Sequence, residues 1–517
     1  MYKQRRQILA KTVGIILLTA ITIALSSSGC SIGKGPSTET SYFPTVEWLS
    51  STPEEQGIDS AILADGLLAI RQKNLNIHSL FIVRNGSVIL DAYFYPYDGK
   101  TVHEFASVTK SIMTTLIAIA ADQGKLDLDQ PMLSFFPDRE IANVDARKER
   151  ITVRHLASMS SGLESMGFEQ DEGTLTEMRA SEDWIQFALD RKVVSEPGTH
   201  FVYDSPGMHL LSAILQEATG MSALEFARQN LFEPLGIGEV LWDTDPQGFN
   251  HGWGDLFLNP LDAAKIGYLW LNKGMWEGKQ IVSSEWVEDS VKMQIKTGLA
   301  DDYGYGWWIM QGDEEAYAAI GRGGQRIQVY PQLNIVIVIT AGGAEYDEIV
   351  AEIAPAVVDT KNPLKANPNG VAKLNTVIQE ISQPPVAILV PPLPSTAREI
   401  SGKTISFQSN PFQLKTVKLD FTEQPEATMH LTFTGSRSSE TAKVGLDGVY
   451  RIFSENDIAL RGYRGYWADE TTFLFDYNDI TRGEAYDISF KFSDKKVIVE
   501  GKERSHEALV TFEGSVQ

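Results

Sequence analysis

Ser107 and Lys110 are the residues of this chain whose types and spacing point most directly to chemistry. A serine hydroxyl is a poor nucleophile at neutral pH, so a serine hydrolase holds a proton acceptor within hydrogen-bond reach of it. Lys110 suits that role because residues three apart on a helix share one face, and a lysine desolvated by apolar neighbours can lose its proton. The helix N-terminus adds unpaired N–H groups that favour a developing oxyanion. The pair therefore predicts a serine nucleophile with a lysine general base.

The spacing is not specific by itself. The same Ser-x-x-Lys spacing occurs at two other places in the chain: Ser31/Lys34 and Ser493/Lys496. The first lies beside the N-terminal leader and the second lies in a charged segment near the C-terminus. Only Ser107 opens an amphipathic-to-apolar helix, which we expect to run to about Gln123 and to end at Gly124.

Two further segments could complete a site. Tyr203-Asp204-Ser205 stands before an expected helix, and a phenol near a lysine can relay the nucleophile's proton to the leaving group. Gly321-Arg322-Gly323-Gly324-Gln325 stands before an expected strand, where glycines let the backbone approach a substrate closely. The N–H of Gln325 could then face the N–H of Ser107 as an oxyanion hole. Taken singly, Tyr203 would be a packed core residue and the glycines an ordinary turn, but their order and context argue against both interpretations.

The elements that must position these residues are visible in the hydrophobic pattern. Residues 80–90 predict two strands around the Asn85-Gly86 turn, which is a strong hairpin signal. From about residue 151 to 235 the pattern is mostly helical, with expected helices at 181–190 and 205–218. Strands return late, and the expected ranges are 305–310, 325–330 and 334–340. A helix-rich middle between early and late strands predicts an α/β (α+β) domain, with an antiparallel sheet assembled from both ends and flanked by helices.

The composition changes after an expected closing helix at 353–359. Seven prolines between positions 363 and 394 have fixed φ angles that disfavour regular structure, so we expect a linker over 359–396. Short strand-like runs follow at 417–421, 429–433 and 496–500, which predict a small all-β domain, sandwich or barrel, over 397–517. Its aromatics Trp467, Phe473 and Tyr477 are expected to fill its core. This domain carries no obvious chemistry, and it could cap the cleft, steady the catalytic domain or bind the cell envelope.

The overall composition bounds the classes of function. With 517 residues, of which 43% are hydrophobic, the chain is long enough for two or three domains and at least one large core. Its formal net charge of −23 argues against nucleic acid as a partner, because a phosphate backbone would be repelled.

The N-terminus has the pattern of an export signal. Basic residues precede an apolar run over 13–25 that is too short to predict a membrane span, and small residues then lead to Cys30. Cys30 is the only cysteine of the chain, and its position resembles a bacterial lipoprotein cleavage site, although Ser27 stands where that pattern prefers an aliphatic residue. We therefore expect a signal peptide over 1–29, lipidation at Cys30 and a polar tether over 30–45, which would anchor an exported protein to the membrane of a bacterial cell envelope. A plain secretory cut is the alternative.

Together the motifs resemble the serine β-lactamase and penicillin-binding-protein superfamily, in particular the branch with class C β-lactamases, D-aminopeptidases, family VIII esterases and 6-aminohexanoate-oligomer hydrolases. The resemblance covers about residues 46–355. It rests on five motifs in order: Ser107-Val108-Thr109-Lys110, Ile151-Thr152-Val153-Arg154-His155-Leu156 leading to Ser160-Ser161-Gly162-Leu163, Tyr203-Asp204-Ser205, Tyr303-Gly304-Tyr305-Gly306-Trp307-Trp308, and Gly321-Arg322-Gly323-Gly324-Gln325. It implies a β-lactamase-like domain with a helical subdomain over 46–358. It also implies that Ser107 is acylated, Lys110 is the general base, Tyr203 is the proton relay, and the amides of Ser107 and Gln325 form the oxyanion hole.

Two departures from the family pattern bear on the substrate. Ser205 stands where this branch often has asparagine, so the carboxamide that holds a substrate's acylamino group is missing. The Lys-Thr-Gly-like element reads Arg322-Gly323-Gly324, in which Arg322 could still attract a substrate carboxylate although the hydroxyl-bearing residue is missing. These four are the expected substrate-binding residues, and both changes favour a small ester or amide over efficient β-lactam hydrolysis or peptidoglycan cross-linking. His155 is expected to be structural, since the lysine and the tyrosine already fill the proton-transfer roles.

The sequence thus predicts an exported serine hydrolase that cleaves a small ester or amide through an acyl-enzyme, with β-lactams and D-amino-acid peptides among the candidates. The alternative is a penicillin-binding-type sensor or cell-envelope binding protein that is not catalytic, or that is acylated without turnover. The sequence has no Gly-x-Ser-x-Gly elbow, no His-Glu-x-x-His zinc motif and no complete dinucleotide-binding loop, so no metal or cofactor is implied.

Overall fold

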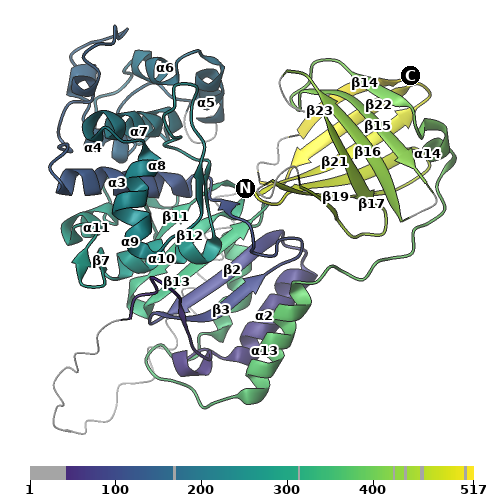
Figure 1. Ribbon diagram of the computed structural model, residues 1–517, viewed down its shortest axis with the longest axis horizontal. Coiled ribbons are helices and arrows are strands. Elements are labelled where there is room, and N and C mark those ends of the chain that lie inside the picture. The colour runs from purple at the N-terminus through teal and green to yellow at the C-terminus, as the bar shows by residue number, and fades with distance from the viewer. Residues whose placement is uncertain are drawn as a thin grey trace.

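The computed structural model describes residues 42–166, 171–312, 315–422, 425–435, 439–454, 459–505 and 509–517. It has a large α/β part and, after an extended segment, a β-barrel that lies to one side of it (Figure 1). The expected signal peptide over 1–29, the lipidation site at Cys30 and the tether up to residue 41 lie outside the described residues.

The large part is built on an eight-stranded sheet with the order β1-β3-β2-β13-β12-β11-β10-β9. Its strands are β1 (Leu49–Ser50), β2 (Ile77–Arg84), β3 (Ser87–Tyr93), β9 (Asp302–Tyr303), β10 (Trp308–Ile309), β11 (Tyr317–Ile320), β12 (Arg326–Tyr330) and β13 (Ile335–Ala341). Neighbouring strands are antiparallel except for β1 and β3. The expected hairpin around Asn85-Gly86 is β2 and β3, and β13 from late in the sequence pairs with β2. The prediction of a sheet assembled from both ends of the domain is confirmed.

Alternate residues of the central strands face two separate cores, as the period of two in a strand requires. On β13, Val336 and Val338 lie in the core of α3 and α10, whereas Ile337 and Ile339 lie in the core of α2, α12 and α13. Helices therefore cover both faces of the sheet, and α2 and α13 run side by side (Figure 1). The bounds are α2 (Ser60–Gln72), α3 (Val108–Asp122), α10 (Pro260–Leu271), α12 (Tyr346–Ile353) and α13 (Pro368–Ile381).

A helical subdomain lies in the chain between the early and late strands. Its main helices are α4 (Val153–Ala157), α5 (Asp171–Ala180), α6 (Trp184–Asp190), α7 (Ser205–Thr219) and α8 (Ala223–Ala227). A small sheet, β4 (His103–Glu104), β6 (Leu256–Leu258) and β5 (Val240–Trp242), joins the start of α3 to this part of the chain. His155 closes a capping box at the start of α4, where the N–H of Thr152 donates to its Nδ1 at 3.1 Å, so the expected structural role of His155 is confirmed.

Two local expectations after the sheet are wrong. The closing helix expected at 353–359 is α12, which ends at Ile353 and is followed by a short 3₁₀ turn over Ala354–Ala356. Pro355 has no N–H to continue the α-helical hydrogen bonds. The segment over 359–396 was expected to lack regular structure, yet it contains α13. Pro368 stands in the first turn of that helix, where the missing N–H costs nothing, and the helix buries Leu374 and Val377 against α2.

The C-terminal domain is a barrel. Its ten-stranded sheet has the order β17-β16-β15-β14-β23-β22-β21-β20-β19-β18, and Gly445 on β17 pairs with Arg464 on β19 to close it. The strands are β14 (Thr404–Phe407), β15 (Leu414–Phe421), β16 (Glu426–Phe433), β17 (Glu440–Gly445), β18 (Arg451–Ser454), β19 (Leu460–Trp467), β20 (Thr472–Asp479), β21 (Glu484–Ser493), β22 (Lys496–Glu503) and β23 (Leu509–Val516). Phe473 is completely buried, and Trp467 and Tyr477 pack against the same core, as expected. The prediction of a C-terminal all-β domain is confirmed.

Candidate active site

The candidate nucleophile stands at the junction of β4 and the central helix α3. The N–H of Phe105 donates to the carbonyl of Leu256 at 2.9 Å and ties this junction to β6. Ala106 then adopts a left-handed backbone conformation with a φ of 45°, which is unusual and costly for a residue with a side chain. The Oγ1 of Thr109 donates to the carbonyl of Ala106 at 2.6 Å and helps to hold it there. The turn leaves Ser107 as the N-terminal cap of α3.

The hydroxyl and the amine that were predicted to react together are in contact. Lys110 Nζ lies 2.9 Å from Ser107 Oγ, and it also donates to the main-chain carbonyl of Trp253 at 3.0 Å. Lys110 is only 2% exposed. In the part of the chain that the structure describes, its hydrogen-bond partners are this hydroxyl and this carbonyl, and neither is a carboxylate. This arrangement is what transfer of the hydroxyl proton to the amine requires.

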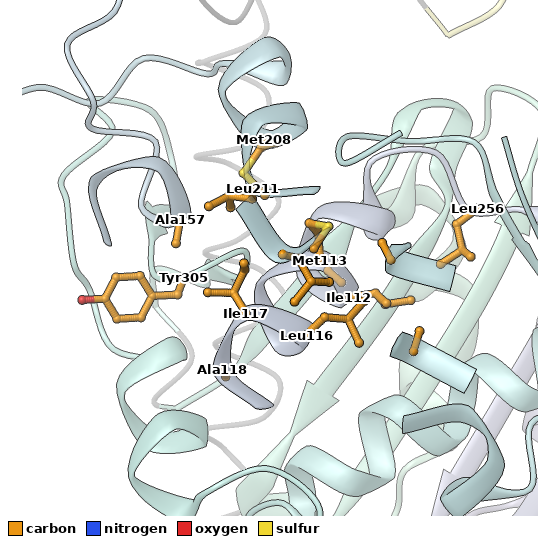
Figure 2. Packing of buried hydrophobic residues seen from close by; sticks show 14 of the residues in the cluster. Ile112, Met113, Leu116, Ile117, Ala118, Ala157, Met208, Leu211, Leu256 and Tyr305 are labelled. Carbon is orange, nitrogen blue, oxygen red and sulfur yellow. The ribbon is translucent and has the colours of Figure 1, made fainter. Parts of the chain in front are cut away.

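The helix that carries both side chains is a firm support, because all of its residues from 108 to 120 are buried. Figure 2 shows Met113 and Ile117 of α3 packed close to Met208 and Leu211 of α7. Complete burial of a Leu or Met side chain stabilises a protein by about 1.5–3 kcal/mol. The central position of α3 therefore keeps the serine and the lysine in one geometry.

Tyr203 lies beside the amine, in the loop that precedes α7. Lys110 Nζ is 4.7 Å from the centre of the Tyr203 ring. The ring stacks on Trp308 of β10, with centroids 6.4 Å apart and planes at 21°. The next residue, Asp204, forms a two-pronged ion pair with Arg191 at 2.6 and 3.1 Å, and both side chains are buried. The loop is thereby fixed with the phenol next to the lysine, and the proton-relay role of Tyr203 stays a prediction that this placement supports.

The glycine-rich turn between β11 and β12 lies against the chain just before Ser107. A Cβ placed on Gly321 would be 2.5 Å from the carbonyl oxygen of Phe105, so no side chain fits there. Gly323 and Gly324 have φ values of 78° and 97°, which residues with a side chain rarely adopt. Glycine is therefore required at these positions for the turn to lie close to the nucleophile.

The side chain of Gln325 holds this turn in place through hydrogen bonds. It is completely buried, its amide donates to the carbonyls of Arg322 and Ala341 at 3.0 and 2.6 Å, and its oxygen accepts from the N–H of Ala341 at 3.0 Å. The main-chain N–H of Gln325 is consequently held in one orientation. Its role with Ser107 in an oxyanion hole stays a prediction.

The predicted substrate-binding residues lie in two different surroundings. Ser205 opens α7 and is 3% exposed, so it is buried. The guanidinium of Arg322 pairs with Glu484 of the barrel at 2.5 Å. Arg322 is therefore not a free cation that could bind a substrate carboxylate, because Glu484 of the barrel already pairs with it.

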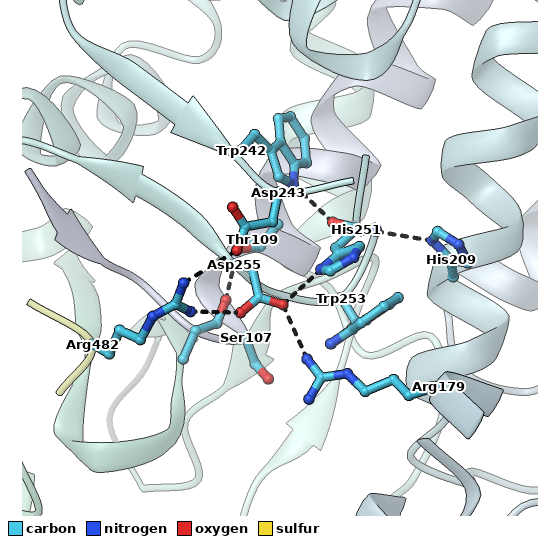
Figure 3. A network of polar contacts seen from close by, with 12 residues as sticks. Ser107, Thr109, Arg179, His209, Trp242, Asp243, His251, Trp253, Asp255 and Arg482 are labelled. Atoms are coloured by element: carbon cyan, nitrogen blue, oxygen red, sulfur yellow. Dashed lines mark hydrogen bonds and ion pairs between the residues drawn. The ribbon is translucent and has the colours of Figure 1, made fainter. Parts of the chain in front are cut away.

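A polar cluster around Asp255 was missed by the sequence analysis. The Asp255 carboxylate accepts from His251 Nδ1 at 2.7 Å and pairs with Arg179 at 3.2 Å and with Arg482 of the barrel at 3.4 Å. Figure 3 shows it flanked by the two arginines, close to Ser107. Burial would raise the pKa of Asp255, but the hydrogen bond from His251 and the two guanidinium charges outweigh burial and hold the pKa at about 2.

This cluster matters because Asp255 is two residues from Trp253, whose carbonyl receives the hydrogen bond of Lys110. Asp255 has a φ of 58°, and a Cβ placed on Gly252 would be 2.1 Å from the carbonyl oxygen of Met208. The run Gly252-Trp253-Gly254-Asp255 therefore follows a path that requires special backbone geometry. The two glycines around a tryptophan were the sequence signal that could have found it.

A family model described as beta-lactamase matches residues 73–360, which is more than half of the chain. The chain belongs to the beta-lactamase family. It is accordingly a serine hydrolase of the kind that cleaves esters and amides, and the superfamily and branch inferred from the motifs are confirmed.

Similar proteins fall in the expected branch of the family. The 6-aminohexanoate-dimer hydrolase of Paenarthrobacter ureafaciens is 24% identical over 312 residues, which are 56% of this chain and 79% of that protein. The beta-lactamase of Escherichia coli strain K12 is 23% identical over 206 residues, which are 40% of this chain and 47% of that protein.

Solved structures share the fold. A putative 6-aminohexanoate-dimer hydrolase from Bacillus anthracis superposes with a TM-score of 0.52 at 19% identity, covering 63% of this chain and 90% of that one. EstCE1, described as a hydrolase with promiscuous acyltransferase activity, superposes with a TM-score of 0.50 at 17% identity, covering 58% of this chain and 99% of that one. Among the described residues of the present chain, no helix is both long enough and apolar enough to cross a membrane.

Proposed function

We propose that the protein is an exported, lipid-anchored serine hydrolase that cleaves a small ester or amide through an acyl-enzyme on Ser107. The observation that carries this proposal is the 2.9 Å contact between Lys110 Nζ and Ser107 Oγ at the N-terminus of a buried helix. The leader before Cys30 supports export and anchoring.

The reaction runs in two halves. Ser107 Oγ attacks the substrate carbonyl carbon while its proton passes to Lys110 Nζ, and the N–H groups of Ser107 and Gln325 bind the oxyanion. Tyr203 relays the proton to the leaving alcohol or amine as the carbon–oxygen or carbon–nitrogen bond breaks, which leaves an ester on Ser107. Water then attacks this ester and gives one proton to Lys110. This proton passes to Ser107 Oγ as the bond between Oγ and the acyl carbon breaks, which releases the acid and restores the serine hydroxyl.

A substrate panel tests the proposal. It contains 4-nitrophenyl esters, nitrocefin, D-amino-acid amides and the 6-aminohexanoate dimer, and each is incubated with wild type, Ser107→Ala and Tyr203→Phe. We expect multiple turnovers of at least one ester or amide, complete loss in Ser107→Ala, and a loss of about 10²–10⁴-fold in Tyr203→Phe. Intact mass spectrometry should show one acyl group on Ser107.

A stoichiometric burst without turnover would support the alternative, a sensor that is acylated once. Absence of both turnover and acylation would support the other form of the alternative, a binding protein that is not catalytic. The anchor has its own test, because Cys30→Ala should move the protein from the membrane fraction of the producing cells to the soluble fraction. A wild-type protein without a covalent lipid would contradict that part of the proposal.

A further inference from the structure

The C-terminal barrel contacts the β-lactamase-like domain near the candidate active site. The contact is made by the turn over residues 480–483, between β20 and β21. The N–H of Glu104, three residues before Ser107, donates to the carbonyl of Thr481 at 2.8 Å. A Cβ placed on Gly323 would be 2.5 Å from the carbonyl oxygen of Gly483. The barrel turn therefore touches both the segment that leads into the nucleophile and the glycine-rich turn opposite it.

The first residue of β21 then places a carboxylate on the predicted substrate-binding arginine. Glu484 Oε1 accepts from Arg322 at 2.5 Å, and Glu484 Oε2 accepts from the hydroxyl of Tyr486 at 3.4 Å. The two charged side chains are 27% and 28% exposed, so the pair lies at a surface that a small molecule can reach. Arg322 is further held by the hydrogen bond from Gln325 to its carbonyl.

Among the described residues, Glu484 is the carboxylate in an ion pair with Arg322, whereas Glu104 and Glu503 add negative charge nearby. Glu104 is buried, and burial together with the Asp255 carboxylate raises the pKa of Glu104 although Arg322 and Arg482 oppose this, which favours the neutral form of Glu104. Glu503 also lies near Arg322, and it accepts a hydrogen bond from the N–H of Ser505. Arg482, the arginine of the barrel turn, is paired with Asp243 and Asp255 (Figure 3).

This arrangement has a consequence for substrate choice. A substrate carboxylate that approached Arg322 would meet the Glu484 carboxylate already in place, and it would have to displace that charge or lie beside it. Like charges at such a position disfavour the wrong ligand, which is how many sites obtain specificity. A neutral acyl group meets no such barrier.

We propose that Glu484 of the barrel is a specificity-determining residue that neutralises Arg322 and makes the site select substrates without a carboxylate near the scissile bond. This inference rests on the proposed hydrolase function, and it assigns the C-terminal domain a part in substrate selection. Arg322 is thereby a partly exposed counter-charge for the barrel in the intact protein, and it becomes a carboxylate-binding group only when Glu484 is removed.

The test compares two esters of equal acyl length on the full chain, 4-nitrophenyl valerate and mono-4-nitrophenyl glutarate. We expect wild type to prefer the valerate. In Glu484→Gln the ratio of kcat/KM for glutarate to kcat/KM for valerate should rise by at least about tenfold, because a charge-assisted arginine–carboxylate contact becomes available to the substrate. The double variant Glu484→Gln/Arg322→Gln should return the ratio to the wild-type value.

Asp487→Asn is the matched control, since Asp487 stands on the same strand but pairs with Arg504 rather than with Arg322, and its ratio should equal that of wild type. An unchanged ratio in Glu484→Gln, or a rise that persists in the double variant, would overturn this inference. The proposed function would still stand as long as wild type hydrolysed the valerate. Failure of wild type to hydrolyse either ester or to become acylated would overturn both.

Discussion

His103 should make the folded protein less stable in mild acid. It lies in β4, immediately before the segment that leads to the nucleophile, and it is completely buried. Its Nδ1–H donates to the carbonyl of Glu104 at 2.7 Å, which leaves Nε2 to accept from Nδ1–H of His78 at 2.9 Å. With these roles His103 is neutral, because protonation would place an Nε2–H of His103 against the Nδ1–H of His78.

The size of the effect follows from the pKa difference between the folded and unfolded chain. Burial lowers the pKa of His103 to about 4, whereas a histidine of the unfolded chain titrates near about 6.5. Above the unfolded value neither state binds the proton and no stability is lost. Below it only the unfolded chain is protonated, so the free energy of unfolding falls by about 1.4 kcal/mol per pH unit until the folded pKa is reached. Between pH 7.5 and pH 5, His103 alone removes about 2 kcal/mol by this reasoning.

Urea unfolding followed by tryptophan fluorescence at pH 7.5 and pH 5 measures this loss in wild type and in His103→Gln. The change in the free energy of unfolding from pH 7.5 to pH 5 should be less favourable in wild type than in the variant by about 2 kcal/mol. Glu104 acts in the opposite direction. Its pKa is raised to about 8 in the folded protein, so the folded state loses stability as the pH rises above the pKa of a glutamate in the unfolded chain. It is present in both proteins and cancels in the difference. Equal losses in wild type and variant would refute the reasoning about the neutral histidine.

Two predictions concern catalysis. Lys110→Met keeps an unbranched side chain in the buried position but removes the amine, so kcat should fall by at least about 10²-fold. Circular dichroism should show that the variant is folded. An activity within tenfold of wild type would exclude Lys110 as the base. Arg482→Ala removes one cationic partner of Asp255. A partly exposed ion pair contributes about 1 kcal/mol, so kcat should fall about fivefold. The control is Lys443→Ala, which removes an exposed ion pair elsewhere on the barrel. A loss in Arg482→Ala no larger than that in Lys443→Ala would show that the barrel does not support the lysine through Asp255.

The parts that the sequence predicted well depend on short-range patterns. The Asn85-Gly86 turn determines its hairpin through the backbone conformations that these residues allow. The spacing of Ser107 and Lys110 on a helix already places the amine within reach of the hydroxyl. The errors were also local, since Pro368 was counted as a breaker although the first turn of a helix accepts proline.

The sequence by itself predicted Ser107 as the nucleophile and Lys110 as the base, and it determined the class of fold, because helical spacing, turn chemistry and hydrophobic period act over a few residues. Only the tertiary structure decided what surrounds the reacting pair. The carbonyl that receives Lys110 is 143 residues away in the chain, and the carboxylate that neutralises Arg322 is 162 residues away on another domain. Such contacts have no periodic signal in the sequence, since they arise from how separate elements pack.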